Sequence, residues 1–314
     1  QVADDWLDTY ADPKVFGKAI GGDILNNKKN WLTTRAFEKA SEEMREQLLA
    51  AMEMPVETEE QKGAKIAVVG ELARKPRYQG AGSSHINPTQ LDNALDELKK
   101  AGFEVEFAQG YELSNKKAKK NNALIAQAAE VAKRNETVVV FIGLTDEYEA
   151  EGFDRTHMNL PDAHDKLVAE ILKVNKNAIV VLAGGSPVEM PWNDGVAAIL
   201  NSYLGGQAGA GAVADILSGA VNPSGKLPET YPMCYNCTPA KNNFPGNPAS
   251  VEYRESVYIG YRYYDKIQKQ VRYPFGFGLS YTTFEYSDIK VSAKSIKDTD
   301  TLTVTVKVKN TGAV

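Results

Sequence analysis

The segment from residue 146 to residue 155 has the strongest potential for chemistry. It reads Asp-Glu-Tyr-Glu-Ala-Glu-Gly-Phe-Asp-Arg, so carboxylates are crowded in it. Neighbouring negative charges raise the pKa of a carboxyl group, as a general acid working at neutral pH requires. The segment therefore predicts a catalytic carboxyl group. The alternative is a solvated acidic loop in which Asp154 and Arg155 form a surface ion pair.

Two further loops combine glycines with polar side chains. They are Arg-Tyr-Gln-Gly-Ala-Gly-Ser-Ser-His-Ile-Asn-Pro at 77–88 and Gly-Gly-Ser-Pro-Val-Glu-Met-Pro-Trp at 184–192. Glycines let the backbone approach a ligand, but they are equally common as turn residues. The Lys-Ser/Thr pair of a phosphate-binding loop is missing from the first loop.

The elements that must position these loops alternate between strand and helix. Apolar and β-branched runs predict strands at 66–69, 103–108, 137–142, 178–183 and 196–203. Helical spacing predicts helices at 91–101, 122–134, 162–173 and 208–217. This order is typical of an α/β fold with a mostly parallel sheet and helices on both faces. Ligands bind beyond the carboxyl ends of such strands, where all three loops lie.

The chain divides into three segments. Residues 1–62 read as helix, turn, helix, with a break at Gly21-Gly22, and residues 63–282 form the α/β segment. Residues 283–314 alternate strictly, which predicts the opening strands of a β-sandwich, truncated at Val314. Because the chain starts at Gln1 without a Met, we expect it to begin within a longer protein.

Composition excludes several classes of partner. The net charge is −5 and the basic residues are scattered, which argues against nucleic acid. No apolar run reaches the roughly 18 residues of a membrane-spanning helix. The first residues do not form a secretory signal, so the compartment stays open, with the cytoplasm favoured.

The two cysteines, Cys234 and Cys237, form a Cys-x-x-Cys pair in a loop rich in Pro and Asn. A zinc site needs a second pair of ligands, and a redox motif needs a strand-to-helix context. Neither is found here. We therefore predict an incidental pair of thiols.

Motifs between residues 65 and 285 resemble glycoside hydrolase family 3 of the β-glucosidase type. In chain order they are Tyr78–Pro88, Glu151-Gly-Phe-Asp-Arg155 with Asn159-Leu-Pro161, Gly205-Gly-Gln207 with Ala214-Asp-Ile-Leu217, Pro223-Ser-Gly-Lys-Leu-Pro228, and Gly260–Asp265 with Pro274–Tyr281. The resemblance covers about 220 residues. It implies the α/β-sandwich domain of that family, followed by a fibronectin III-like domain.

The resemblance implies retaining hydrolysis of a β-glucoside or oligosaccharide without a cofactor. In the family, an Asp on a (β/α)8 barrel attacks the anomeric carbon, and a Glu of the α/β domain acts as acid and then as base. Glu151, directly before Gly-Phe-Asp-Arg, is the implied acid/base, with Glu149 in reserve. The barrel, with its Ser-Asp-Trp-Gly nucleophile strand, is missing here. Asp5-Trp6 matches two residues of that motif but lies in a helical context. It must come from another part of the protein or another chain.

Other loop residues receive roles from the same resemblance. Asp154 and Arg155 hold the acid/base loop in shape. Ser84 and His85 contact sugar hydroxyls or the facing barrel, or have a purely structural role. Trp192 is either an aromatic platform for a sugar or a core residue.

The first residues resemble a different family. The runs at 1–8, 12–18 and 20–29 are similar to the second aspartate-rich region of trans-polyprenyl diphosphate synthases. Asp4, Asp5 and Asp8 would then hold Mg²⁺ on a diphosphate, with Lys18 on the same phosphates. By spacing alone, such acids complement a helix dipole. The first aspartate-rich motif of that family is missing, so synthase activity is not expected.

Three functions follow from these patterns. The first is a glycoside hydrolase represented by its acid/base domain, which requires no metal. The second is a Mg-dependent polyprenyl diphosphate synthase fragment. The third is a catalytically dead carbohydrate-binding module. The length covered by each resemblance favours the hydrolase.

Overall fold

The computed structural model describes residues 63–83, 85–113, 122–247 and 249–312. The chain divides into two units, 1–58 and 59–314, and all described residues belong to the second. The helical segment predicted for 1–62, with Asp4, Asp5, Asp8 and Lys18, lies outside the described residues. Ser84 lies outside them as well.

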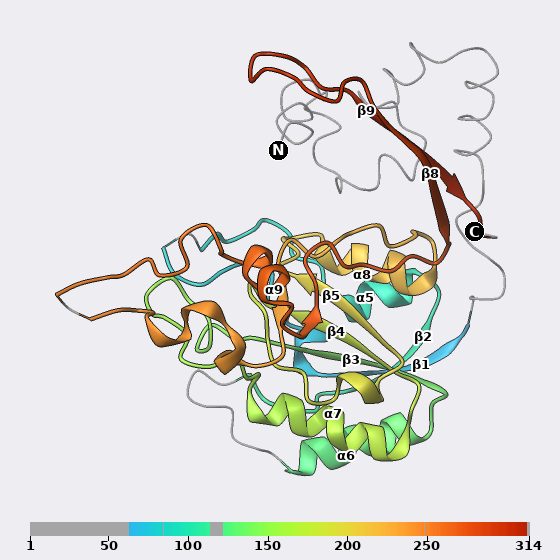
Figure 1. Ribbon diagram of the computed structural model, residues 1–314. Coiled ribbons are helices and arrows are strands. Elements are labelled where there is room, and N and C mark those ends of the chain that lie inside the picture. Colours follow the sequence, from blue (N-terminus) through green and yellow to red (C-terminus); the bar gives the residue numbers. More distant parts are fainter. Residues whose placement is uncertain (1–62, 84, 114–121, 248, 313–314) are drawn as a thin grey trace. The chain divides into compact units, whose positions relative to one another are not determined.

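A five-stranded parallel sheet forms the centre of the α/β domain (Figure 1). Its strands are β1 (Lys65–Val69), β2 (Glu104–Ala108), β3 (Thr137–Gly143), β4 (Ala178–Ala183) and β5 (Ala198–Tyr203), in the spatial order β2-β1-β3-β4-β5. All four neighbouring pairs are parallel. After their first residues, the central strands β1, β3 and β4 are apolar because both faces of the sheet are covered. The predicted fold class is confirmed.

Among the described residues, four helices cover the sheet, two on each face (Figure 1). Helices α5 (Ala94–Lys100) and α8 (Gly209–Ser218) lie on one face, and α6 (Asn122–Lys133) and α7 (Asp162–Val174) on the other. The helix predicted for 91–101 begins three residues late. Asn93 is its N-cap, since its side chain accepts a hydrogen bond from the backbone N of Asp96 at 3.1 Å.

Helix α7 places a histidine in the core. His164 is 1% exposed, and its ring centroid lies 3.9 Å from that of Tyr111. Its Nδ1 accepts a hydrogen bond from the backbone N of Gly143 at 3.3 Å. Burial disfavours the charged imidazolium and lowers the pKa of His164 to about 3. The histidine is therefore a neutral core residue at physiological pH.

We expect His164 to make the domain sensitive to acid. Its pKa is about 3 when folded and 6.5 ordinarily, so the unfolded chain binds the proton more readily within this window. As the pH is lowered through this window, the free energy of unfolding therefore decreases by about 1.4 kcal/mol per pH unit. The test variant is His164→Asn, which keeps an acceptor for Gly143. When the pH is lowered from 7 to 4.5, its free energy of unfolding, measured by urea denaturation, should decrease by about 2–3 kcal/mol less than that of the wild type.

A second titrating group on α7 acts in the opposite direction. Burial raises the pKa of Asp165 to about 6, so its contribution to stability grows as the pH falls and is lost as the pH rises through that value. Asp165 is present in both proteins, and its contribution cancels in the comparison. Equal losses of stability in the wild type and His164→Asn would contradict the prediction.

The remainder of the chain adds short elements and a hairpin. Strands β6 (Tyr231–Pro232) and β7 (Val271–Tyr273) pair antiparallel, and helix α9 (Tyr261–Ile267) lies between them in sequence. Strands β8 (Phe284–Val291) and β9 (Val304–Asn310) also pair antiparallel, with every residue exposed. Antiparallel pairing of this alternating segment fits the predicted opening of a β-sandwich. Its fibronectin III-like character stays a prediction.

Cys234 and Cys237 form a disulfide, so the prediction of an incidental thiol pair is wrong. The 3₁₀ turn Tyr235–Cys237 (η4) brings the two Cα atoms to 5.1 Å, a separation that a disulfide spans. The spacing of the two cysteines was compared with zinc and redox motifs only. A single tight turn is enough to bring the two sulfur atoms together.

Candidate active site

The loops after β1 and β3 meet at the carboxyl edge of the sheet. These strands are neighbours, but the chain leaves β1 for α5 on one face and β3 for α7 on the other (Figure 1). Such a reversal leaves a crevice in which open α/β sheets bind ligands. The backbone N of Glu151 donates to the carbonyl O of Ala81 at 3.2 Å, which joins the two loops.

Glu151 lies in a tight turn closed by a bridge between Ala150 and Phe153. Its exposed side chain accepts two hydrogen bonds on Oε2, from the backbone N of Ser83 at 3.0 Å and from Ser83 Oγ at 2.6 Å. Gly82 permits this approach, because its φ is +117° and an added Cβ would lie 2.8 Å from Glu151 Oε2. The turn therefore presents one fixed carboxylate beside the loop after β1.

The hydrogen bonds of the Ser83 hydroxyl and backbone hold the pKa of Glu151 below its ordinary value. The prediction that crowded carboxylates raise the pKa is therefore wrong for this residue. Glu151 is solvent-exposed, and Glu149 is bonded to other partners. In this chain Glu151 is a carboxylate at neutral pH.

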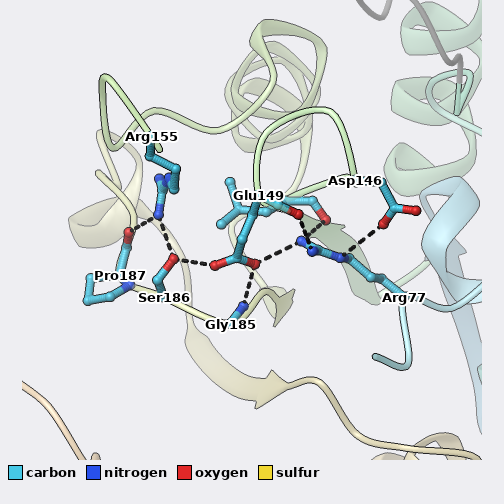
Figure 2. A network of polar contacts seen from close by, with 8 residues as sticks. Arg77, Asp146, Glu149, Arg155, Gly185, Ser186 and Pro187 are labelled. Carbon is cyan, nitrogen blue, oxygen red and sulfur yellow. Dashed lines mark hydrogen bonds and ion pairs between the residues drawn. The ribbon is translucent and has the colours of Figure 1, made fainter. Parts of the chain in front are cut away.

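Glu149 is the centre of a polar network that joins three loops (Figure 2). Its Oε2 accepts hydrogen bonds from Arg77 Nη1 at 2.9 Å and from the backbone N of Gly185 at 2.8 Å, and Ser186 Oγ donates to its Oε1. Arg77 Nη2 also donates to the carbonyl O of Glu149 at 2.8 Å. Because both carboxylate oxygens are engaged, these contacts favour Glu151 over Glu149 as the proton-transfer group.

Arg77 extends this network and is itself buried. Its Nη1 donates to the carbonyl O of Leu144 at 3.0 Å, and its Nε lies 3.5 Å from Asp146 Oδ1. Sequence reasoning missed this residue. The available signal was that Arg77 is the sole Arg or Lys of its loop and that the next loop along the sheet edge is strongly acidic.

Arg155 anchors the loop after β4. Its Nη1 donates to Ser186 Oγ at 2.7 Å and to the carbonyl O of Pro187 at 2.9 Å (Figure 2). These contacts support the loop-shaping role proposed for Arg155 and exclude a surface ion pair with Asp154. Asp154 is exposed, and no hydrogen bond or ion pair holds its side chain within the described residues.

The remaining predicted residues have different environments. His85 is exposed, and its ring lies edge-on to Tyr78 at 6.1 Å between centroids. Trp192 is 5% exposed, and its Nε1 donates to Asp165 Oδ1 at 2.8 Å, so it is a core residue and not a sugar platform. Ser83 contacts Glu151, a contact that sequence reasoning did not predict. Spacing alone did not separate Ser83 from its neighbour Ser84.

No grouping of three or more His, Cys, Asp or Glu side chains suited to a metal occurs in the described part of the chain. Within the same residues, none of the helices has the length and apolar character needed to cross a membrane.

The chain matches the family described as the Glycosyl hydrolase family 3 C-terminal domain over residues 54–281. The parallel α/β domain is therefore that of a glycosidase family. The chain belongs to glycosyl hydrolase family 3. A second family, Polyprenyl synthetase, matches residues 1–69 only.

Relatives agree with this assignment. Thermostable beta-glucosidase B of Acetivibrio thermocellus is 50% identical over 254 residues, which cover 80% of this chain and 33% of the relative. An exo-alpha-(1->6)-L-arabinopyranosidase of Bifidobacterium longum is 45% identical over 243 residues, or 77% of this chain and 32% of that protein. The chain thus spans about a third of the length of these curated relatives.

Solved structures share the fold. The crystal structure of the Bifidobacterium adolescentis GH3 beta-glucosidase superposes with a TM-score of 0.74 at 46% identity, covering 80% of this chain and 36% of that chain. Beta-glucosidase 3B from Thermotoga neapolitana, in complex with alpha-D-glucose, superposes with a TM-score of 0.68 at 33% identity over 80% of this chain and 38% of that chain.

Proposed function

We propose that this chain supplies the acid/base half of a retaining glycosidase and acts with a (β/α)8 barrel that carries the nucleophile. The observation that carries the proposal is Glu151, an exposed carboxylate fixed on a turn at the carboxyl edge of the sheet. The 50% sequence identity to a β-glucosidase supports it. The barrel comes from another part of the protein or from another chain.

Glu151 has two tasks in this proposal. It protonates the leaving oxygen while the nucleophile of the barrel attacks the anomeric carbon, and it then accepts a proton from the water that releases the sugar. The first task requires protonated Glu151. A facing barrel would exclude solvent and bring a second carboxylate to about 5–5.5 Å, and both effects raise the pKa of Glu151. Neither task requires a cofactor.

The proposed substrate is a β-D-glucoside or a β-linked glucosyl oligosaccharide. The names of most of the relatives support glucose as the glycone, and an arabinopyranosidase among them marks the nearest alternative. For the compartment, the disulfide between Cys234 and Cys237 favours an oxidising environment over the cytoplasm that the sequence favoured.

A hybrid enzyme tests the proposal. The matching 254 residues of this chain replace their counterpart in the Acetivibrio β-glucosidase. We expect the hybrid to hydrolyse p-nitrophenyl β-D-glucopyranoside, and to do so faster than p-nitrophenyl α-L-arabinopyranoside. This chain alone should turn over neither, because a retaining mechanism needs two carboxylates.

The controls are the intact Acetivibrio enzyme and its barrel without the replaced part. A hybrid that folds, as shown by circular dichroism and a cooperative melt, but hydrolyses neither glycoside would contradict the proposal. In that case the catalytically dead carbohydrate-binding module becomes the better description. For residues 1–69 the match to polyprenyl synthetases is kept as a sequence relationship, and no synthase activity is proposed.

A further inference from the structure

The disulfide between Cys234 and Cys237 closes a very short loop. Only two residues separate the cysteines, and the chain contains no others. A cross-link stabilises a fold mainly by restricting the unfolded chain, and the restriction grows with the length of the loop that the cross-link closes. This disulfide therefore contributes little to the stability of the domain as a whole, and we look for its effect in its immediate surroundings.

The disulfide is accessible to a thiol from solution. Both cysteines are partly exposed, and Asn236 between them is exposed. A disulfide is cleaved when a thiolate reaches one of its sulfurs, and exposed disulfides are the labile and regulatory ones. Because η4 is a single 3₁₀ turn and not the start of an α-helix, the pair lacks the setting of an oxidoreductase. It is suited to control its own surroundings instead.

The turn at 234–238, here called the disulfide turn, has few other interactions of its own. The backbone N of Cys237 donates to the carbonyl O of Cys234 at 2.9 Å. The backbone N and Oγ1 of Thr238 donate to the carbonyl O of Tyr235 at 3.1 Å and 2.9 Å. The hydrogen bonds of one isolated turn do not offset the conformational entropy of the residues that they order. We therefore expect the disulfide turn to loosen when the S–S bond is broken.

The disulfide turn is tied to the loop after β4 through a carboxylate. The backbone N of Tyr235 donates to Glu189 Oε1 at 2.9 Å. The backbone N of Glu189 in turn donates to the carbonyl O of Met158, in the loop after β3, at 2.8 Å. Glu189 thus connects the disulfide turn to the loop that carries Glu151.

The loop after β4 also holds the loop after β3 through Arg155. Arg155 Nη1 donates to Ser186 Oγ and to the carbonyl O of Pro187, which precede Glu189 directly in the chain (Figure 2). Ser186 Oγ donates to Glu149 as well. A displacement of Glu189 is therefore expected to reach the contacts that hold the loop of the proposed acid/base in place.

We propose that Cys234 and Cys237 form a redox switch that orders the loop after β4 when oxidised and releases it when reduced. A thiolate of a dithiol reductant attacks one cysteine sulfur, and the S–S bond breaks. The second thiol of the reductant then cleaves the mixed disulfide. The chain gains two thiols, taking up two electrons and two protons, and the reductant is oxidised to a disulfide. Only the effect of the switch on hydrolysis rests on the proposed function.

Amide hydrogen exchange of the full chain, oxidised or reduced with dithiothreitol, tests this proposal. We expect peptides that contain Tyr235 or Glu189 to exchange at least about tenfold faster after reduction, as loss of a hydrogen bond to a charged group predicts. The double variant Cys234→Ser with Cys237→Ser should exchange at the fast rate with and without the reductant. Peptides from the buried strand β3 should exchange at one rate in every form.

Glu189→Ala separates the disulfide from the contact that transmits its effect. This variant keeps both cysteines but offers Tyr235 no carboxylate. Its loop after β4 should exchange fast in the oxidised form and no faster after reduction. The matched control is Glu252→Ala, which removes a carboxylate that is 59% exposed and pairs with Arg254. This control should respond to dithiothreitol as the wild type does.

In the hybrid enzyme, reduction should lower kcat about tenfold, because the loop that carries Glu151 loses a support. The hybrid with both cysteines replaced by serine should be equally slow with and without the reductant, which controls for cysteines in the Acetivibrio part. An active hybrid whose kcat is the same in both redox states would contradict the proposal.

Two results on the chain itself would also overturn the proposal. One is unchanged exchange at Glu189 although thiol titration shows that both cysteines are reduced. The other is a disulfide that withstands a large excess of dithiothreitol in the folded chain. Because exchange needs no substrate, an inactive hybrid would contradict the proposed function, whereas the exchange rates would still decide on the switch.

Discussion

Glu151→Gln is expected to lower the kcat of the hybrid enzyme toward p-nitrophenyl β-D-glucopyranoside by about 10²–10⁴-fold. Glutamine has the shape of glutamate and still accepts hydrogen bonds from Ser83, but its amide is neither an acid nor a base at neutral pH. The matched control is Glu104→Gln. Glu104 is exposed at the start of β2, on the edge of the sheet opposite the turn, so this change should leave kcat unaltered.

The leaving group and an added anion separate the two tasks of Glu151. A 2,4-dinitrophenolate leaves without protonation, so Glu151→Gln should form the glycosyl-enzyme from that substrate and release a burst of phenol. Azide should then restore turnover, because an anion attacks without a general base. Equal losses with both substrates and no rescue by azide would exclude Glu151 from proton transfer. The same series on Glu149→Gln would then follow.

Arg77→Leu is expected to lower the free energy of unfolding by about 3–5 kcal/mol, measured by urea denaturation at pH 7. Arg77 is 8% exposed and pairs with Glu149, whose side chain is 20% exposed. Removing the cation leaves a largely buried carboxylate without its charge partner, which is more costly than losing the pair as a whole. The loop after β4 also loses its link to the loop after β1.

Two comparisons sharpen this test. Arg134→Leu removes an arginine that pairs with Glu106 and whose side chain is 54% exposed, and it should cost less than about 1 kcal/mol. The double variant Arg77→Leu with Glu149→Leu should recover part of the lost stability, because the only carboxylate left without Arg77 is that of Asp146, whose side chain is exposed. A cost for Arg77→Leu no greater than that for Arg134→Leu would show that the network does not stabilise the fold.

The helices and strands were predictable because the spacing of their apolar residues shows which positions are buried. The run Val138–Ile142 is buried on both faces and reads as a continuous apolar strand, and the amphipathic α7 repeats at helical spacing. The start of α5 was missed by three residues because the capping role of Asn93 was not considered. The disulfide was missed because it depends on a 3₁₀ turn that has no periodic signal.

The candidate site was predictable in its place but not in its electrostatics. That three loops gather at the carboxyl edge follows from parallel strands alone. Which way each carboxylate turns does not, because Glu149 and Glu151 are two residues apart and meet different partners, Arg77 and Ser83. Spacing predicted mutual repulsion between them, whereas the fold separates them. The pKa of Glu151 is lowered by the hydrogen bonds from the Ser83 side chain and backbone, which the spacing of the carboxylates did not reveal.

The two hydrogen bonds from Ser83 decide which half of the reaction the unaccompanied domain is ready for. A carboxylate that is stabilised in its charged form can take a proton but has none to give at neutral pH. Cleavage of the glycosidic bond begins with donation of a proton to the leaving oxygen. In the proposed enzyme, Glu151 therefore becomes a general acid only when the barrel covers the turn. We expect the domain without its barrel to hydrolyse no glycoside.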